Sequence, residues 1–251
     1  MSQLQQESQI FVKTIPSRSW GDVPDRALTS IDLWKIYIPA HLQIIDQLSA
    51  LLSPDEKSRV TRYHQQKDKN RFVIGRGMLR QILSYYTGCS PRELQFAKGI
   101  NNKPSIQPAF PIEFNLSYSQ EFIVVGIASQ PIGADIEFIH PDFDYSLLLD
   151  ACFMAPEIKV IVDAADPRQE FFLFWTRKEA LLKATALGLG DYLTDFSCLE
   201  GAQPIPKFLP TEGDWQLESF LLEERYWISL AKNFPAPHQY IDAKILFKHG
   251  S

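Results

Sequence analysis

Residues 171–190 read FFLFWTRKEALLKATALGLG, which is the strongest helix signal in the second half of the chain. Apolar side chains recur there at helical spacing and predict one broad buried stripe. Its members are Phe171, Phe174, Trp175, Leu181, Leu182 and Thr185. Glu179 and Lys183 stand four residues apart with the acid first, the favourable order for an ion pair on a helix. We therefore expect a long helix over residues 169–187, with both charges at the border of its stripe.

A strand is predicted upstream, where residues 130–139 read QPIGADIEFI. Side chains alternate between the two faces of a strand, so Asp135 and Glu137 share one face, about 7 Å apart. The other face is taken as the core face and carries Ile132, Ala134, Ile136 and Phe138. Two carboxylates held this way suit Mg²⁺, which prefers oxygen ligands. Taken alone, either segment is more typical of an ordinary solvated surface than of a functional site.

The rest of the first half predicts the same kinds of element. Ser53 is the expected N-cap of a short helix with Pro54 at its first position, and Gly88 is the expected stop of a long one. Helices are expected over residues 41–52, 53–64 and 67–88, and strands over 31–39, 94–98, 114–119 and 122–128. In the second half, helical segments are expected around 145–163, and strands near 195–199, 215–222, 225–232 and 239–247.

Each half therefore runs from a strand through helices to further strands. This order predicts an α+β fold of two similar halves related by a pseudo-twofold, with mainly antiparallel sheets and a long helix packed on each. We expect an irregular N-terminal arm over residues 1–30, an N-terminal half over 31–129, and a C-terminal half over 130–251 that carries the metal site.

Composition bounds the function further. The 251 residues carry a net charge of −5, which argues against broad nucleic-acid binding as the main activity. Cys89, Cys152 and Cys198 are isolated in the sequence and form neither a zinc motif nor a disulfide framework. The first residues lack the basic and apolar regions of a signal peptide, and no apolar run reaches membrane-spanning length. We therefore expect a cytoplasmic protein.

Together, GADIE at residues 133–137 and WTRKEALLK at 175–183 resemble the paired signature of the 4′-phosphopantetheinyl transferase superfamily, a G-x-D-x-E strand and a W/F-x-x-K-E-A-x-x-K helix. Further segments are similar to other family motifs: Asn102-Lys103-Pro104, Phe114-Asn115-Leu116-Ser117, and a helix with Arg71, Gly75, Arg76, Leu79 and Arg80. The length resembles the surfactin-synthetase-activating type, whose single chain holds two related halves. One position departs: Tyr118 stands where members often carry a histidine that binds a coenzyme A phosphate.

The resemblance implies transfer of the 4′-phosphopantetheine group from coenzyme A to a serine of an apo acyl or peptidyl carrier protein, with release of adenosine 3′,5′-bisphosphate. The carrier would be an acidic domain of fatty-acid, polyketide or nonribosomal peptide synthesis, and the enzyme a monomer. Mg²⁺, with Mn²⁺ as a substitute, would be held by Asp135, Glu137 and Glu179. Glu179 would also act as general base, and Lys183 would bind the pyrophosphate.

Binding of coenzyme A is expected to use further residues, of which Lys103 and Ser117 match phosphate-binding motifs. The other candidates are Lys57, Arg59, Arg62, Arg76 and Tyr118. The basic residues before the long helix are equally consistent with a solvated face, and Tyr118 with a packed strand aromatic. Arg71 and Arg76 are five residues apart on one helix, so at most one of them is expected to reach the nucleotide.

Two other functions remain open on sequence alone. A metal-dependent phosphohydrolase built on the same acids would release phosphopantetheine to water and need no carrier. A non-catalytic carrier-binding module would have no reason to keep the four charges of Asp135, Glu137, Glu179 and Lys183.

Overall fold

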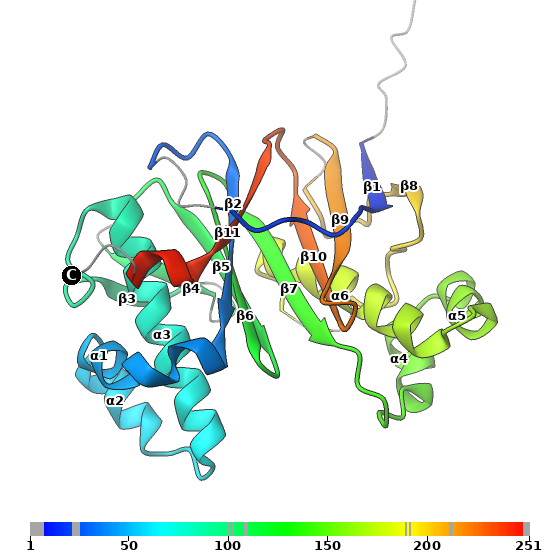
Figure 1. Cartoon of the computed structure of the whole chain (residues 1–251). Coiled ribbons are helices and arrows are strands. Elements are labelled where there is room, and N and C mark those ends of the chain that lie inside the picture. The colour runs from blue at the N-terminus through cyan, green and yellow to red at the C-terminus, as the bar shows by residue number, and fades with distance from the viewer. Residues whose placement is uncertain are drawn as a thin grey trace, which may run out of the picture. The chain divides into compact units, whose positions relative to one another are not determined.

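The computed structural model describes residues 8–21, 26–99, 101, 103–107, 110–188, 190, 192–210 and 213–247. The chain forms two compact units (Figure 1). Unit 1 comprises residues 1–18 and 130–235, and unit 2 comprises residues 19–129 and 236–251. Each unit combines helices with a mainly antiparallel sheet, which confirms the expected α+β class. Within the described ranges, no helix is both long enough and apolar enough to cross a membrane.

Unit 1 is built on a five-stranded sheet with the order β7-β10-β9-β1-β8. The strands are β1 (Gln9–Thr14), β7 (Ile132–Phe138), β8 (Gly201–Pro204), β9 (Trp215–Leu222) and β10 (Tyr226–Lys232). The pairing of β1 with β9 is parallel, and the other pairs are antiparallel. Its helices are η3 (Ser146–Leu148), α4 (Leu149–Cys152), α5 (Ala155–Asp163) and α6 (Pro167–Thr185).

Helix α6 is the central helix of unit 1. Asp166 caps its start by accepting the backbone N–H groups of Arg168 and Gln169, and Pro167 suits the first turn because its missing N–H would have no helical partner there. Buried residues cover most of its circumference rather than one stripe. The helix is therefore embedded in the unit, and any charged side chain on its buried faces needs a partner.

Unit 2 is built on a four-stranded sheet with the order β11-β2-β6-β5 and a separate hairpin of β3 and β4. The strands are β2 (Ile31–Tyr37), β3 (Gln95–Lys98), β4 (Pro104–Gln107), β5 (Glu113–Ser119), β6 (Phe122–Ala128) and β11 (His238–Asp242). The helices are η1 (Ile38–Ile44), α1 (Ile45–Ala50), α2 (Pro54–Val60), α3 (Gln66–Thr87) and η4 (Ala243–Phe247).

The long helix α3 packs on the sheet of unit 2 and shares a hydrophobic cluster with β2, β5 and β6. Gly75 allows a close approach, since a Cβ there would lie 3.2 Å from Ile123 Cδ1. The helix ends where predicted, at Gly88, whose φ of 73° lies in the left-handed region. The predicted cap of α2 is also present, with Ser53 and Glu56 bonding each other's backbone N–H groups.

The structure differs from the expected N-terminal arm and from the expected extent of the C-terminal half. Residues 9–14 form β1 between β8 and β9, with Ile10 and Val12 buried. Residues 238–242 form β11, which pairs with β2 of unit 2. The partners of both strands lie far away in the sequence, so no local pattern predicts these pairings. A strand near β11 was expected, but as part of the C-terminal half.

Smaller differences concern single elements. The expected helix over 41–52 is a 3₁₀ turn followed by the short helix α1, and the last expected strand ends at Asp242, where η4 begins. No strand forms over 195–199, because the Cys198 N–H bonds the Glu157 carboxylate instead of a neighbouring strand. The hairpin strand β4 was not predicted, and Asn102, beside it, lies outside the described residues.

Candidate active site

The acidic residues of the paired signature meet between β7 and α6 in unit 1. Asp135 is fully buried, and Glu179 is nearly so. Lys183 joins them, with its Nζ 2.5 Å from Asp135 Oδ1 and 3.0 Å from Glu179 Oε2. Asp135 therefore does not lie on a solvated strand face. This excludes the alternative that residues 133–137 form an ordinary surface strand.

Gly133 explains why β7 and α6 come so close. A Cβ at this position would lie 1.8 Å from the Ala180 carbonyl oxygen and 2.5 Å from the Ala184 backbone nitrogen, so only glycine fits. Because side chains two residues apart share a strand face, Asp135 also points toward α6. The face expected to be an open one is thus covered by the helix, while Ile132, Ala134 and Ile136 are buried on the other face.

Burial and the neighbouring charge of Asp135 raise the pKa of Glu179 above its usual range, against the opposing effects of Lys183 and of a hydrogen bond with Trp175. Burial acts to lower the pKa of Lys183, but the negative charges of Asp135 and Glu179 outweigh it and raise that pKa. The cluster therefore holds a firmly charged ammonium and a carboxylate that accepts protons more readily than a free glutamate.

The predicted metal ligands are only partly brought together. Glu137 is half-buried further along β7, and the described part of the chain gathers no three His, Cys, Asp or Glu side chains into a group that could hold a metal. The ammonium group of Lys183 lies between Asp135 and Glu179, where a metal ion bound by these two carboxylates would lie. The donors themselves fit a hard cation: they are carboxylate oxygens, and one carboxylate raises the pKa of the other.

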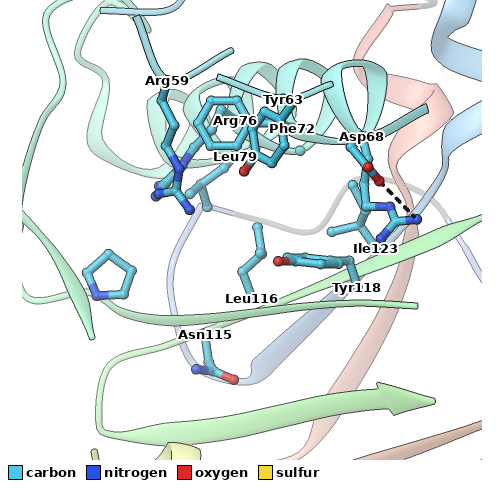
Figure 2. Close-up of a pocket in the computed structure, with 13 residues that line it drawn as sticks. Arg59, Tyr63, Asp68, Phe72, Arg76, Leu79, Asn115, Leu116, Tyr118 and Ile123 are labelled. Carbon is cyan, nitrogen blue, oxygen red and sulfur yellow. Dashed lines mark ion pairs between the residues drawn. The ribbon is translucent and has the colours of Figure 1, made fainter. Parts of the chain in front are cut away.

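A second group of predicted residues surrounds a pocket of about 250 Å³ in unit 2 (Figure 2). Arg59 comes from α2, Arg71 and Arg76 come from α3, and Tyr118 comes from β5. Its apolar lining includes Phe72. Three guanidinium groups around one concave, largely apolar pocket make a site suited to an anion with an attached ring system.

The arginines of this pocket are electrostatically crowded. Burial lowers the pKa of Arg76, and the charges of Arg59 and Arg80 lower it further, against the attraction of Glu56. Glu56 lies 2.8 Å from Arg80 Nη2 but 3.9 Å from Arg76 Nε. An anion beside Arg76 would relieve this crowding.

Arg71 and Arg76 both line the pocket, although their five-residue separation on one helix predicted that they point in different directions. Arg71 is drawn to the side by Asp68, 4.0 Å away, and by Tyr118, whose ring centroid lies 5.6 Å from the guanidinium carbon. Long side chains on neighbouring faces of a helix can thus converge although their Cα–Cβ bonds diverge.

The remaining predicted contacts do not all share this pocket. The exposed Lys57 borders a wider groove of about 1160 Å³ that also includes Arg59 and Arg76. Lys103 is half-buried beside Pro104, and burial lowers its pKa. Ser117 is buried on the face of β5 opposite to Tyr118, because successive strand residues alternate. Ser117 and Tyr118 therefore do not form one contact, and Arg62 is exposed outside both hollows.

Sequence reasoning missed several residues of these sites. No feature of the sequence indicated that Glu56, in the first turn of α2, binds Arg80. Trp175 was read as part of an apolar stripe, although its side chain bonds Glu179. The contact between Trp175 and Glu179 could have been predicted from their spacing, because residues four apart on a helix are neighbours on its surface.

Comparisons with known proteins match most of this chain to one family. Residues 131–231 match the family described as the 4′-phosphopantetheinyl transferase superfamily, and residues 38–131 match the one described as 4′-phosphopantetheinyl transferase, N-terminal. HetI, a 4′-phosphopantetheinyl transferase of Nostoc sp. strain PCC 7120, is 33% identical over 63% of this chain and 70% of its own length.

Two further relatives extend the match. A putative 4′-phosphopantetheinyl transferase of Synechocystis sp. strain PCC 6803 is 30% identical over 77% of this chain and 84% of its own length. The 4′-phosphopantetheinyl transferase Sfp of Bacillus subtilis strain 168 is 26% identical over 61% of this chain and 68% of its own. The chain belongs to the 4′-phosphopantetheinyl transferase superfamily. It is an enzyme that transfers phosphopantetheine from coenzyme A to a carrier protein.

Proposed function

We propose that Asp135, Glu137 and Glu179 hold a Mg²⁺ ion during this transfer, and that Glu179 and Lys183 act on the reacting groups. The observation that supports it most is the contact of Lys183 with both Asp135 and Glu179, which puts two carboxylates and a cation in one buried cluster. When bound, the divalent cation would neutralise charge on the pyrophosphate of coenzyme A.

The reaction forms a bond between the carrier serine oxygen and the β-phosphorus of coenzyme A and breaks the bond from that phosphorus to the bridging oxygen. Glu179 accepts the serine proton, directly or through a water molecule, and its raised pKa makes it a better base than an exposed glutamate. Lys183 donates hydrogen bonds to the pyrophosphate oxygens, and its ammonium stays charged through the reaction.

The pocket in unit 2 is proposed to bind the nucleotide part of coenzyme A. Arg59, Arg71 and Arg76 supply fixed positive charge for phosphate groups, and Tyr118 holds Arg71 by its ring. Lys57, which borders the wider groove, and Lys103, which is next to the pocket residue Pro104, are proposed as further phosphate contacts. Ser117 faces the other side of β5, so we propose it only as a separate contact.

The enzyme is proposed to work as a monomer on an acidic apo acyl or peptidyl carrier. A cytoplasmic location is proposed because coenzyme A and carriers are used there, and it agrees with Cys89, Cys152 and Cys198 being thiols.

The metal assignment is tested with Asp135→Ala and Glu179→Gln, and with Asp142→Asn as a control that removes an exposed acid of the same unit. Binding of Mn²⁺ is followed by its electron paramagnetic resonance signal, and transfer is measured at limiting Mg²⁺. Both site variants should lose Mn²⁺ binding and at least about 100-fold in turnover, while the control keeps both. Near-normal turnover of either site variant at limiting Mg²⁺ would show that the metal assignment is wrong.

A further inference from the structure

Lys178, which precedes Glu179 on α6, is a fully buried lysine that none of the proposed catalytic steps uses. Its ammonium has three acceptors: the Leu193 carbonyl at 2.6 Å, the Phe196 carbonyl at 2.8 Å and Glu157 Oε2 at 2.9 Å. A lysine ammonium carries three N–H donors. Every donor of Lys178 therefore has a partner, and the group is held in a single position.

Its partner Glu157 is equally buried and equally engaged. Glu157 Oε1 accepts the Cys198 N–H at 2.7 Å, and Oε2 accepts the Met154 N–H at 2.8 Å. The pair thus ties the middle of α6 to the start of α5 and to the segment 193–198. The ring of Phe196, 4.4 Å from the ammonium nitrogen, adds a cation–π contact.

Arg177 fixes the adjacent side of α6. This buried residue donates to Ser219 on β9, to the Cys198 carbonyl and to Thr14 on β1, and it pairs with Glu200. Successive residues on a helix point about 100° apart. Arg177 and Lys178 therefore hold α6 from two directions, and the next residue, Glu179, points toward Asp135.

We propose that Lys178 is a positioning residue for the transfer reaction, which acts by fixing the rotation of α6 about its own axis. Reactive groups need to be held within about 0.5 Å, and a turn of α6 would move Glu179 and Lys183 away from Asp135 together. The inference rests on the proposed roles of Glu179 and Lys183.

The chemistry of the pair supports a role in geometry rather than in stability. Burying two charges is costly, and apolar residues of similar volume often stabilise a fold as well or better. The Lys178–Glu157 pair instead supplies directional bonds to two carbonyls and two N–H groups, which apolar side chains would not position. Arginine would keep the charge but would not direct three donors from one atom toward these three acceptors.

The test compares Lys178→Arg and Lys178→Met with the wild type, and uses Lys159→Ala, which removes an exposed lysine of α5, as a control. Kinetics are measured at a temperature where circular dichroism shows each protein folded. The proteins also carry 5-fluorotryptophan, and the ¹⁹F signal of Trp175 is assigned with Trp175→Phe. Trp175 bonds Glu179, Trp227 bonds the Gln169 carbonyl at the start of α6, and Trp34 lies in unit 2 as a reference.

We expect both Lys178 variants to lose about 10- to 100-fold in kcat, with KM for coenzyme A near wild type. The Trp175 signal should move and the Trp34 signal should not, and the control should match wild type. If Lys178→Met does not fold, Lys178→Arg decides. Wild-type kcat and an unmoved Trp175 signal in a folded Lys178 variant would overturn the inference. Glu179→Gln is measured in parallel: if it keeps full activity, the proposed function fails instead.

Discussion

Tyr118 stands at the position where the family resemblance led us to expect a histidine. The residue is 54% exposed, and its ring lies beside the guanidinium group of Arg71. A phenol carries no positive charge, but its ring face attracts a guanidinium. We therefore propose that Tyr118 acts in the pocket through its ring rather than through its hydroxyl.

This assignment predicts different effects of two substitutions on the affinity for coenzyme A. Tyr118→Phe keeps the ring and should bind coenzyme A within about twofold of wild type. Tyr118→Leu removes the ring and should weaken binding about two- to fivefold, the equivalent of an exposed cation–π contact of about 0.5–1 kcal/mol. Calorimetric titration of coenzyme A into the three proteins measures both. A loss of tenfold or more in Tyr118→Phe would make the hydroxyl a phosphate ligand.

Glu179 gives a prediction for pH. Burial and the charge of Asp135 raise its pKa in the metal-free protein. A raised carboxyl pKa means that Glu179 binds its proton more tightly in the folded protein than an ordinary glutamate does. A bound cation has the reverse effect, because it favours the ionised carboxylate. Mg²⁺ should therefore lower this pKa and release protons. Carbon-13 NMR titration of the glutamate carboxyls with and without Mg²⁺, with Glu179→Gln for assignment, measures the change. A pKa that does not respond to Mg²⁺ would place the ion elsewhere.

The contact between β7 and α6 depends on Gly133, where the strand backbone meets the helix backbone. Overpacking of a core usually costs about 1–3 kcal/mol. Here the added Cβ would meet the Ala180 oxygen at 1.8 Å, and neither partner is a flexible side chain. Gly133→Ala should therefore lower the free energy of unfolding by at least about 3 kcal/mol, or displace α6 and abolish transfer.

Gly21→Ala is a matched control for this change, because the nearest atom to its added Cβ is 3.8 Å away, an ordinary contact. Urea unfolding of both variants gives the two free energies. A Gly133→Ala protein with wild-type stability and activity would show that β7 and α6 do not approach as closely as described.

Helices and strands were predictable where their signals are local. Ser53 and Gly88 mark helix ends by capping chemistry, and the alternation of residues 132–138 marks β7. Strand β1 was not predicted, because it pairs with residues about 200 positions away. A strand at the position of β11 was predicted, but its pairing with β2 was not, because β2 lies near the other end of the chain. The extensive burial of α6 could not be predicted either, because Arg177 and Lys178 are typical surface residue types and their buried partners lie elsewhere in the chain.

Across the whole molecule, the sequence predicted which charged residues meet in unit 1, but not how residues converge on the pocket in unit 2. The meeting of Asp135, Glu179 and Lys183 followed from two segments that match one family signature. The convergence of Arg71 and Arg76 on one pocket did not, because it depends on side-chain conformation on α3. The separation of Ser117 from Tyr118 follows from strand alternation alone and was available from the sequence.

Intact-protein mass spectrometry of apo carrier proteins tests the central claim most directly. Each carrier is incubated with coenzyme A, Mg²⁺ and either the wild type, Asp135→Ala or Asp142→Asn. The wild type and Asp142→Asn should add the mass of one phosphopantetheine group to the carrier, and Asp135→Ala should leave it unmodified. Free phosphopantetheine with unmodified carrier in the wild-type reaction, or full modification by Asp135→Ala, would contradict the account.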